Sequence, residues 1–522
     1  METSRTDLPD ISRPRTRSPV QGIAAGLLAA GVALGIGELI SGLVRGTASP
    51  VVSVGSFVID HTPPSLKVFA VRTFGTNDKP ALIIGTLILL AVFAAIVGLI
   101  GRQRRAFAFG GVALFGLLGV GAALTRPTSR LVDVLPSVIG ALAGIAVIGW
   151  LLHVRPITKD PTPSASHGFG RRSFLVAGTA TGIAAAATGG IGRQLRQRFN
   201  VSAARSGVAL PLPASPAPPR PAGAELGVDG VASFITPNAS FYRIDTTLTT
   251  PQVDPTSWRL RIHGMVNKEL TFTYDDLLKR PLRERDITMI CVSNEVGGEY
   301  TGTARWLGVP LSEVLKEAGV KPTANQMVSR SVDGWTCGTP VADVIDGRDA
   351  MIVLGMNGEP LPVEHGFPAR LIVPGLYGFV SATKWVTDIE LTTFDAFDAY
   401  WVKRGWARKA PIKTMARIDT PKGLSRTAPG KTVIAGVAWA IHRSVTSVEV
   451  RIDAGPWQKA TLGQTPTADT WVQWKLDWEA TPGNHTITCR ATDGTGTLQT
   501  EDRAKPIPDG ASGWHSIIVF KE

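Results

Sequence analysis

Cysteine is scarce in this chain, and histidine is nearly as scarce. The 522 residues include 3 cysteines and 8 histidines. A disulfide framework needs paired cysteines and a cysteine metal site needs short, regular spacings, and the three cysteines offer neither. Haem inside a helical bundle would need facing histidines, but His61, His153 and His167 of the first part lie at or beyond the ends of apolar runs. These absences exclude a disulfide-rich scaffold and give no support to bound haem.

The excess positive charge lies in the first part of the chain. Residues 1–198 hold 20 lysines and arginines against 8 acidic residues, whereas residues 199–522 hold 34 of each kind, so the first part carries the whole net charge of +12. A nucleic-acid-binding protein would place a basic patch on its folded domain, and the second part has no such surplus. We therefore expect no nucleic acid partner.

Long apolar runs occupy this basic part, at about 20–44, 80–101, 106–124, 131–152 and 173–192. Each is long enough to cross a hydrocarbon core of about 30 Å as a helix, and each lacks the polar stripe of a soluble amphipathic helix. A cleaved signal peptide would explain only one of them. The sequence predicts a membrane region at 1–198, with about five transmembrane helices in the lipid bilayer.

Basic residues beside the runs indicate the orientation of this region. Arginines precede the first run, lie at 102–105 between the second and third, and stand at 171–172 before the fifth. The positive-inside rule then places the N-terminus in the cytoplasm, and five crossings place residues 199–522 outside it. Basic residues on the predicted outer side, such as Arg126 and Arg193, are not explained by this orientation.

The fifth run begins Gly170-Arg171-Arg172-Ser173-Phe174-Leu175 and continues in alanine, glycine and threonine, so it is weakly hydrophobic. It resembles a twin-arginine export signal in an internal position. The alternative is an ordinary arginine pair at the cytoplasmic end of a helix. Because the twin-arginine route carries folded proteins, such a signal favours a cofactor enzyme downstream. We expect the run to remain as an anchor, with a cut near Ala203-Ala204 as the other possibility.

The sequence pattern divides the second part of the chain into three regions. Residues 199–229 are rich in proline and predict an extended linker. From 230 to 415, short apolar strands alternate with turns and brief helices, such as the one expected at 310–319, which predicts a mixed α+β domain. From 416 to 522, strict alternation takes over, as at Val448, Val450 and Ile452, and predicts an immunoglobulin-like β-sandwich. The expected fold is therefore multi-domain, with an N-terminal α-helical transmembrane region followed by these two domains.

Cys291 ends a short apolar run and opens a glycine-rich turn. A cysteine at a strand end beside backbone amides and arginines can be held as the thiolate, which is the form that binds a soft metal. Taken alone, a cysteine is more often a small buried apolar residue. Cys337 and Cys489 lack such surroundings, and we expect both to be structural.

Cys291 also belongs to a series of short motifs. Asn294 follows it by three residues, and Ala304-Arg305-Trp306 and Gly308-Val309-Pro310-Leu311 come next. The other blocks are Ser240-Phe241-Tyr242-Arg243, Met356-Asn357-Gly358-Glu359-Pro360-Leu361, His365-Gly366-Phe367-Pro368-Ala369-Arg370, Val373-Pro374-Gly375-Leu376-Tyr377-Gly378, Lys384-Trp385 and Trp514-His515. With these blocks in the family's order, residues 235–522 resemble the sulfite oxidase family of molybdopterin enzymes.

This resemblance implies that molybdenum is held by the two sulfurs of one molybdopterin and by Cys291. Arg243 and Trp406 would be further catalytic residues beside a small-molecule substrate. The implied cofactor-binding residues, which supply charge-assisted donors or a close approach of the backbone, are Asn294, Arg305, His365, Arg370, Gly378 and Lys384. An electron-transfer partner of unknown identity is implied too, as is a homodimer through the sandwich, which mediates dimerisation in the family.

The chain departs from the family's sulfite oxidisers at pocket positions. Glu295-Val296 replace an arginine pair, Trp406 replaces a tyrosine, and Ile244-Asp245 replace an Asn-His pair. A pocket with fewer such donors holds a small dianion less well. We therefore expect a membrane-anchored, extracytoplasmic molybdopterin-dependent oxidoreductase, a sulfoxide-type reductase more than a sulfite dehydrogenase. The alternatives are a non-catalytic cell-surface binding module on a degenerate molybdopterin fold, and a membrane region that is itself the functional element.

Overall fold

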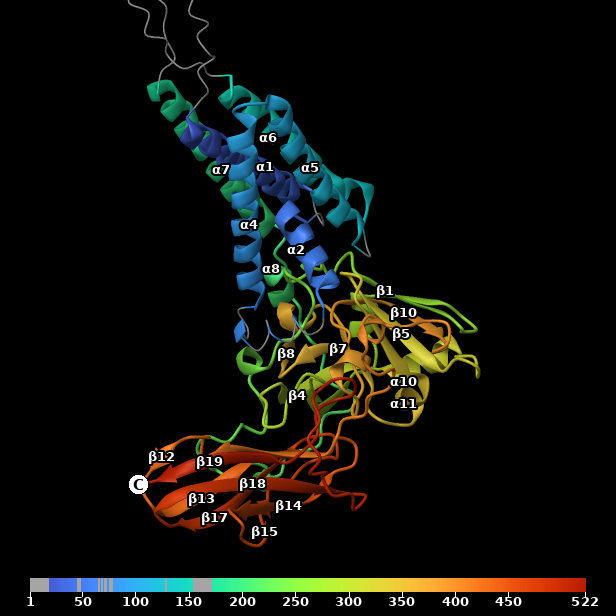
Figure 1. The fold of residues 1–522 in the computed structure, drawn as a ribbon. Coiled ribbons are helices and arrows are strands. Elements are labelled where there is room, and N and C mark those ends of the chain that lie inside the picture. Colours follow the sequence, from blue (N-terminus) through green and yellow to red (C-terminus); the bar gives the residue numbers. More distant parts are fainter. Residues whose placement is uncertain are drawn as a thin grey trace, which may run out of the picture. The chain divides into compact units, whose positions relative to one another are not determined.

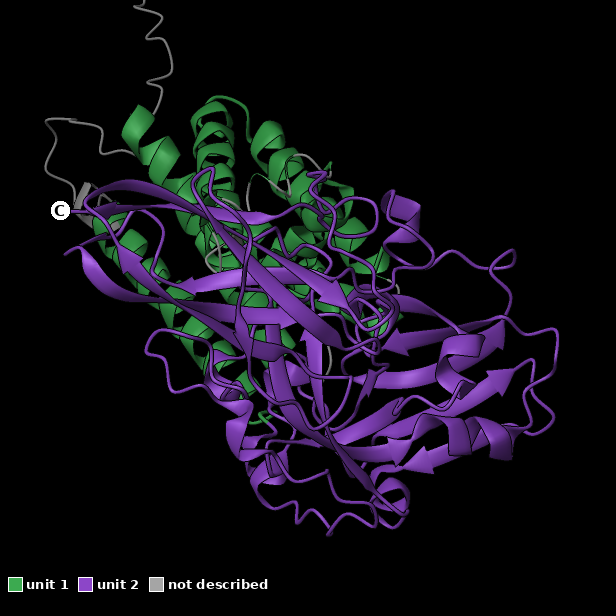
Figure 2. Cartoon of the chain, turned by 90° about the horizontal axis from the view of Figure 1, so that it is seen from below, with its two compact units in different colours: residues 1–200, 247–249 green, residues 201–246, 250–522 purple. Residues whose placement is uncertain are grey.

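The computed structural model of the chain describes residues 18–44, 48–63, 66, 69, 73–74, 78–126, 129–153 and 171–522 (Figure 1). The chain forms two compact units, which Figure 2 colours separately. The first unit consists of residues 1–200 with 247–249, and the second of residues 201–246 with 250–522. The arginines expected to precede the first run, and Gly170 of the twin-arginine motif, lie outside the described residues.

The first unit is a bundle of helices. Its helices are α1 (Pro19–Leu43), α2 (Pro50–His61), α4 (Asp78–Gly101), α5 (Arg105–Leu124), α6 (Leu135–Leu151) and α7 (Arg171–Gln197). Within the described residues, five helical segments are long and apolar enough to cross a membrane, namely Pro19–Leu43, Lys79–Gly101, Arg105–Leu124, Leu131–Leu151 and Phe174–Ser206. These segments confirm the five predicted runs, whereas the shorter α2 was not predicted.

Small residues let α1 pack closely against its neighbours in this bundle. A Cβ atom at Gly26 would lie 2.0 Å from the carbonyl oxygen of Ala94 on α4, and one at Gly42 would lie 2.3 Å from that of Gly192 on α7. Glu38 of α1 also forms an ion pair with Arg196 of α7. Close backbone approach through glycine is typical of helix pairs in membranes, where dispersion contacts replace the hydrophobic effect.

The second unit begins with two sheets, of which the first is mixed and the second antiparallel. One sheet has the order β2-β1-β10-β5-β6, in which β1 and β10 are parallel, and the other has the order β3-β4-β7-β8 with β9 beside β7. The strands are β1 (Arg259–Gly264), β2 (Leu270–Thr273), β3 (Arg283–Ile290), β4 (Thr301–Pro310), β5 (Gln326–Ser331), β6 (Thr336–Pro340), β7 (Met351–Met356), β8 (Glu359–Pro360), β9 (Arg370–Ile372) and β10 (Val386–Thr392).

Short helices complete this sheet-rich region, namely α8 (Ser202–Ser206), α9 (Tyr274–Leu278), α10 (Leu311–Ala318) and α11 (Val341–Ile345). Helix α10 matches the helix predicted at 310–319. It buries Leu311, Val314, Leu315 and Ala318, and ends at Gly319, whose φ of +67° favours glycine.

Residues 415–521 form two further sheets that share one apolar core. The first has the order β11-β13-β17-β16 and the second β12-β19-β18-β14-β15. The strands are β11 (Met415–Thr420), β12 (Arg426–Thr427), β13 (Gly430–Trp439), β14 (Val445–Ile452), β15 (Gln458–Lys459), β16 (Thr461–Leu462), β17 (Val472–Ala480), β18 (Gly483–Asp493) and β19 (His515–Lys521). Val450 and Cys489 of one sheet meet Ile434 and Trp474 of the other in this core, as the alternation predicts, while the immunoglobulin-like class remains a prediction.

Residues 201–229, most of the expected proline-rich linker, belong to the second unit and contact its strands. The Arg205 guanidinium donates hydrogen bonds to the carbonyl oxygens of Pro360 and Leu361, at 2.6 and 2.8 Å, and pairs with the Glu359 carboxylate at 2.8 Å. Further on, Ser215 forms a β-bridge with Arg283 of β3. This part of the chain is therefore bound along the strands that carry the candidate site.

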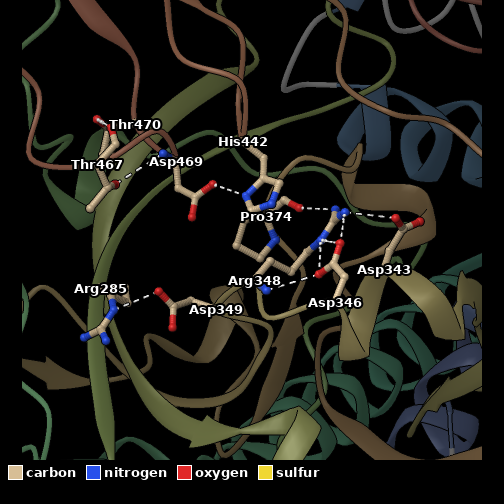
Figure 3. A network of polar contacts seen from close by, with 10 residues as sticks. All are labelled: Arg285, Asp343, Asp346, Arg348, Asp349, Pro374, His442, Thr467, Asp469 and Thr470. Carbon is tan, nitrogen blue, oxygen red and sulfur yellow. Dashed lines mark hydrogen bonds and ion pairs between the residues drawn. The ribbon is translucent and has the colours of Figure 1, made fainter. Parts of the chain in front are cut away.

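Figure 3 shows the polar contacts of Arg348, in the region of the first two sheets, beside those of His442 and Asp469 in the sandwich. Arg348 donates to the Asp343 carboxylate at 2.9 Å and to the Pro374 carbonyl oxygen at 2.8 Å. His442 of the sandwich contacts Asp469 at 3.1 Å, and the Asp469 carbonyl oxygen accepts from the N–H of Thr288 on β3 at 2.9 Å. Strand β3, which leads to Cys291, is thus hydrogen-bonded directly to the sandwich.

Candidate functional site

Cys291 follows the last residue of β3, at the start of the loop that leads to β4. Its N–H donates to the carbonyl oxygen of Tyr300 at 3.0 Å, and its own carbonyl oxygen accepts from the N–H of Asn294 at 3.0 Å. Burial raises the pKa of the Cys291 thiol, against hydrogen bonds from Ser293 and the charge of Lys384. In this environment a metal ion would have to displace the thiol proton on binding.

Asn294 is buried in the same turn. Its Oδ1 accepts from the N–H of Tyr300 at 2.8 Å, while its Nδ2 has no hydrogen-bond partner in the described part of the chain. Position 298, in the same loop, requires glycine because a Cβ atom there would lie 2.6 Å from Asn294 Oδ1. A buried amide nitrogen without a partner costs free energy unless a ligand accepts its hydrogen bond.

Arg370, the first residue of β9, is a buried cation without an acidic partner among the described residues. Its side chain donates from Nη1 to the carbonyl oxygen of His365 at 3.1 Å, and its Nε has no partner. The guanidinium carbon lies 5.3 Å from the Trp306 ring, and burial lowers the pKa of Arg370 to about 10. A buried guanidinium in this state is well suited to bind an anion such as a phosphate.

Lys384 and Arg243 share one carboxylate, that of Asp245. Lys384 Nζ lies 2.9 Å from Asp245 Oδ2, and Arg243 Nε lies 3.0 Å from the same oxygen. Lys384 also donates to the carbonyl oxygen of Glu364 at 3.2 Å, and burial lowers its pKa to about 8. The three side chains therefore form one connected charge cluster.

His365 is buried next to this cluster. Burial, and then the charges of Arg370 and Lys384, lower its pKa to about 4, so the imidazole is neutral near pH 7. Gly366 follows with a φ of +115°, and a Cβ there would lie 3.1 Å from Arg370 Cβ and 3.2 Å from Lys384 Cα. The turn at His365-Gly366 thus brings the arginine and the lysine together.

The other predicted residues lie in two further places. Arg305 donates to both oxygens of the Asp286 carboxylate, at 2.8 and 3.0 Å. Because Asp286 precedes Cys291 by five residues of extended strand, about 16 Å along β3, the structure does not bring the Arg305 guanidinium to Cys291. Gly378, in contrast, lies near the end of β3, where its Cβ would be 3.9 Å from the carbonyl oxygen of Ile290. Trp406 packs 5.6 Å from Phe379, between ring centroids.

Two residues of the site were missed by the sequence reasoning. Tyr242 stacks on Phe241 with ring centroids 5.2 Å apart, and burial raises its pKa, with Cys291 and Arg370 as neighbouring titratable groups. Asp245 bridges Arg243 and Lys384, as described above. Both lie within two residues of Arg243, so the motif around that arginine was the available signal.

Comparison with known proteins identifies the family. A family model for the oxidoreductase molybdopterin binding domain matches residues 247–401. The chain is 30% identical over 340 residues to the mitochondrial sulfite oxidase of Rattus norvegicus, which covers 55% of this chain and 62% of that protein. It is 31% identical over 157 residues to the uncharacterized oxidoreductase YuiH of Bacillus subtilis (strain 168), which covers 29% of this chain and 74% of that protein.

A solved structure is also similar. The sulfane dehydrogenase SoxCD from Paracoccus pantotrophus aligns with 58% of this chain and 90% of its own, at 24% identity and a TM-score of 0.48.

Fold, site and relatives together define a molybdopterin-binding oxidoreductase. The chain belongs to the sulfite oxidase family of molybdopterin-dependent oxidoreductases, as the motifs predict. Molybdenum bound by molybdopterin is accordingly its cofactor. The chain spans 62% of the length of the rat sulfite oxidase that it matches.

The described residues fit this cofactor. Molybdopterin carries a phosphate and a polar ring system, and the site offers a buried arginine with an unpaired Nε and a buried amide with an unpaired Nδ2. A half-buried thiol, Cys291, lies at the end of β3 as a soft ligand for the metal.

Proposed function

We propose that this protein is a membrane-anchored, extracytoplasmic oxidoreductase that reduces a small, neutral sulfoxide-type compound, with sulfite oxidation as the competing reaction. The observation that carries the proposal is Arg370, a buried cation whose Nε has no partner in the described chain, in the same site as Cys291. A non-catalytic module would gain nothing from a buried, unpaired charge, which destabilises the fold until an anion binds.

The residues of the site would have different roles in binding the cofactor. Arg370, Lys384 and the unpaired Asn294 amide would bind the pterin and its phosphate, and neutral His365 would contribute a further polar contact. Cys291 would ligate the metal. When bound, molybdenum supplies two-electron oxygen-atom transfer, and the protein contributes orientation, electrostatics and the exclusion of water.

The surroundings of the site support a neutral substrate. The arginine pair of the family's sulfite oxidisers is replaced by Glu295-Val296, and Trp406 with Phe379 and Trp401 offers an aromatic surface, with ring centroids 5.6 and 6.0 Å from Trp406. Such a surface packs well against the apolar groups of a sulfoxide. The reaction breaks a sulfur–oxygen bond, consumes two electrons and two protons, and yields a sulfide and water.

The helical unit supports the membrane location. Within the described residues, five helical segments of sufficient length and apolarity begin before the second unit, and α7 begins at the arginine pair. We place the second unit outside the cytoplasm, where a separate electron-transfer protein or membrane donor would reduce the site, and we expect the sandwich to form a homodimer.

Metal analysis and a substrate screen test this function together. The full chain, purified from a host that makes molybdopterin, should contain about one molybdenum per chain. With a reduced viologen dye it should turn over sulfoxides, and with ferricyanide it should oxidise sulfite more slowly. Molybdenum without any turnover of these compounds would reject the substrate class, and protein without molybdenum or pterin would favour the binding module.

A further inference from the structure

Asp245 is a buried carboxylate that contacts two cations through one oxygen. Its side chain is 4% exposed, and its Oδ2 lies 3.0 Å from Arg243 Nε and 2.9 Å from Lys384 Nζ. Arg243 is held a second time, because its Nη2 donates to Thr250 Oγ1 at 2.9 Å. The arginine that the family resemblance assigns to the substrate is therefore already paired with a fixed negative charge.

The two arginines of the site differ in this respect. Arg370 has no carboxylate partner within the described residues, so its charge is available to an anion. Arg243 shares the Asp245 carboxylate with Lys384, whose charge the proposed function assigns to the pterin and its phosphate. An incoming sulfite or sulfate at Arg243 would therefore meet the Asp245 carboxylate as well as the guanidinium. Like charges in close contact are strongly unfavourable in a site shielded from water. A neutral oxygen acceptor does not meet this repulsion.

We propose that Asp245 determines specificity by excluding small oxyanions from the part of the site that holds Arg243, while Arg243 donates a hydrogen bond to the oxygen of a neutral sulfoxide. The inference rests on the proposed function and names its substrate class. Arg243 can serve in this way because its side chain is 40% exposed, with Nε and Nη2 bound to Asp245 and Thr250.

Substitutions at Asp245 can separate the effect of its negative charge from the effect of its hydrogen bonds. Asp245→Asn keeps an oxygen acceptor for Arg243 and Lys384 but removes the negative charge, and Asp245→Glu keeps the charge. Glu269→Gln is the matched control, since it removes one carboxylate from a surface pair with Arg261, at 2.9 Å, in which both side chains are more than half exposed. Asp245→Ser removes the charge in a smaller side chain and replaces the asparagine variant if that variant does not load molybdenum.

Two measurements on the full-length holoenzyme test the proposal. The first is the ratio of kcat/KM for sulfite to kcat/KM for a sulfoxide, which should rise at least about tenfold in Asp245→Asn and change less than about twofold in Glu269→Gln and Asp245→Glu. The second is calorimetric binding of inorganic sulfate, whose Kd should fall by about tenfold or more in Asp245→Asn.

The possible outcomes are distinct. An equal loss of both activities in Asp245→Asn, with sulfate binding unchanged, would make Asp245 a structural bridge only and overturn the proposal. If the unmodified enzyme turns over neither substrate, the proposed function fails, and the sulfate measurement alone decides. Tighter sulfate binding in the asparagine variant then still supports charge exclusion, and equal binding rejects it.

Discussion

The imidazole of His515, on the last strand of the sandwich, lies directly against Gly297, six residues after Cys291. A Cβ atom at Gly297 would lie 2.3 Å from His515 Nε2, and His515 Nδ1 accepts from the N–H of Ile418 at 3.0 Å. Arg417 adds a second support by donating to the carbonyl oxygen of Gly298 at 2.9 Å. The sandwich thus supports the loop that carries Cys291 and Asn294.

Gly297→Ala should disturb this loop and, with it, cofactor binding. The residue has a φ of +81° and no room for a methyl group, so we expect a loss of about 1–3 kcal/mol in stability and a clear fall in molybdenum content. Thermal unfolding and metal analysis measure both effects. Gly496→Ala is the control, because Gly496 has a φ of +84° with no atom within 4 Å of its Cβ position. Adding His515→Ala to Gly297→Ala removes the imidazole that the new methyl group would meet, so part of the molybdenum content should return. If the molybdenum content does not recover, the contact between Gly297 and His515 is not the cause of the loss.

Cys291→Ser should abolish turnover but keep much of the cofactor. A serine oxygen is a harder ligand that loses its proton less readily than a thiol, so the redox properties of the metal change. The pterin should remain bound, since Arg370, His365, Lys384 and backbone amides are proposed to hold it. Molybdenum and pterin content, measured together with turnover, distinguish a role of Cys291 in the reaction from a role in holding the cofactor. An active serine variant would remove Cys291 from the mechanism, and an inactive one without pterin would make it an anchor.

Two arginines should respond in opposite ways to replacement by methionine. Arg370→Met removes a buried charge without a counterion, so the cofactor-free protein should become more stable, by about 1 kcal/mol or more, while cofactor content collapses. Arg305→Met instead leaves the buried Asp286 carboxylate without its partner and should cost about 3 kcal/mol. Unfolding midpoints and pterin content of the two variants provide the comparison. Loss of pterin in the second variant without loss of stability would support the predicted cofactor-binding role of Arg305.

Acid should weaken the sandwich through Asp493. Burial alone would raise the pKa of this carboxyl, but hydrogen bonds from Thr495, Arg443 and Thr414 lower it to about 2. Because the folded-state pKa lies below the unfolded value, its stabilisation of about 2 kcal/mol is present above about pH 4 and is lost as the pH falls towards 2. Asp493→Asn should therefore lower the unfolding midpoint at pH 7 and flatten its decline between pH 4 and 2. An unchanged acid profile would show that other carboxyls dominate.

The orientation of the chain can be tested with a reporter fused after residue 225, which should be active only outside the cytoplasm. Replacing Arg171 and Arg172 by lysines should leave the four preceding helices inserted and strand the second unit inside, because the export pathway reads the arginine pair as an address. Protease access from the periplasmic side of spheroplasts reports the location. Normal export of the lysine variant would reduce the pair to a topology signal.

The sequence by itself determined the features that depend on local pattern. In the described part of the chain, five helical segments match the predicted apolar runs, because length and apolarity decide whether a helix can span a bilayer. Helix α10 and the core strands of the sandwich followed from their periods, and the motifs around Cys291 identified the family. In each case the relevant residues are neighbours in the chain, so spacing carries the information.

Only the tertiary structure decided which of these residues meet. It paired Arg305 with Asp286, left Arg370 without a carboxylate in the described chain, and joined Arg243 and Lys384 through Asp245. It also placed His515 on Gly297. Such contacts join residues far apart in the chain, and no local period or propensity records them, because they depend on how whole strands and sheets pack.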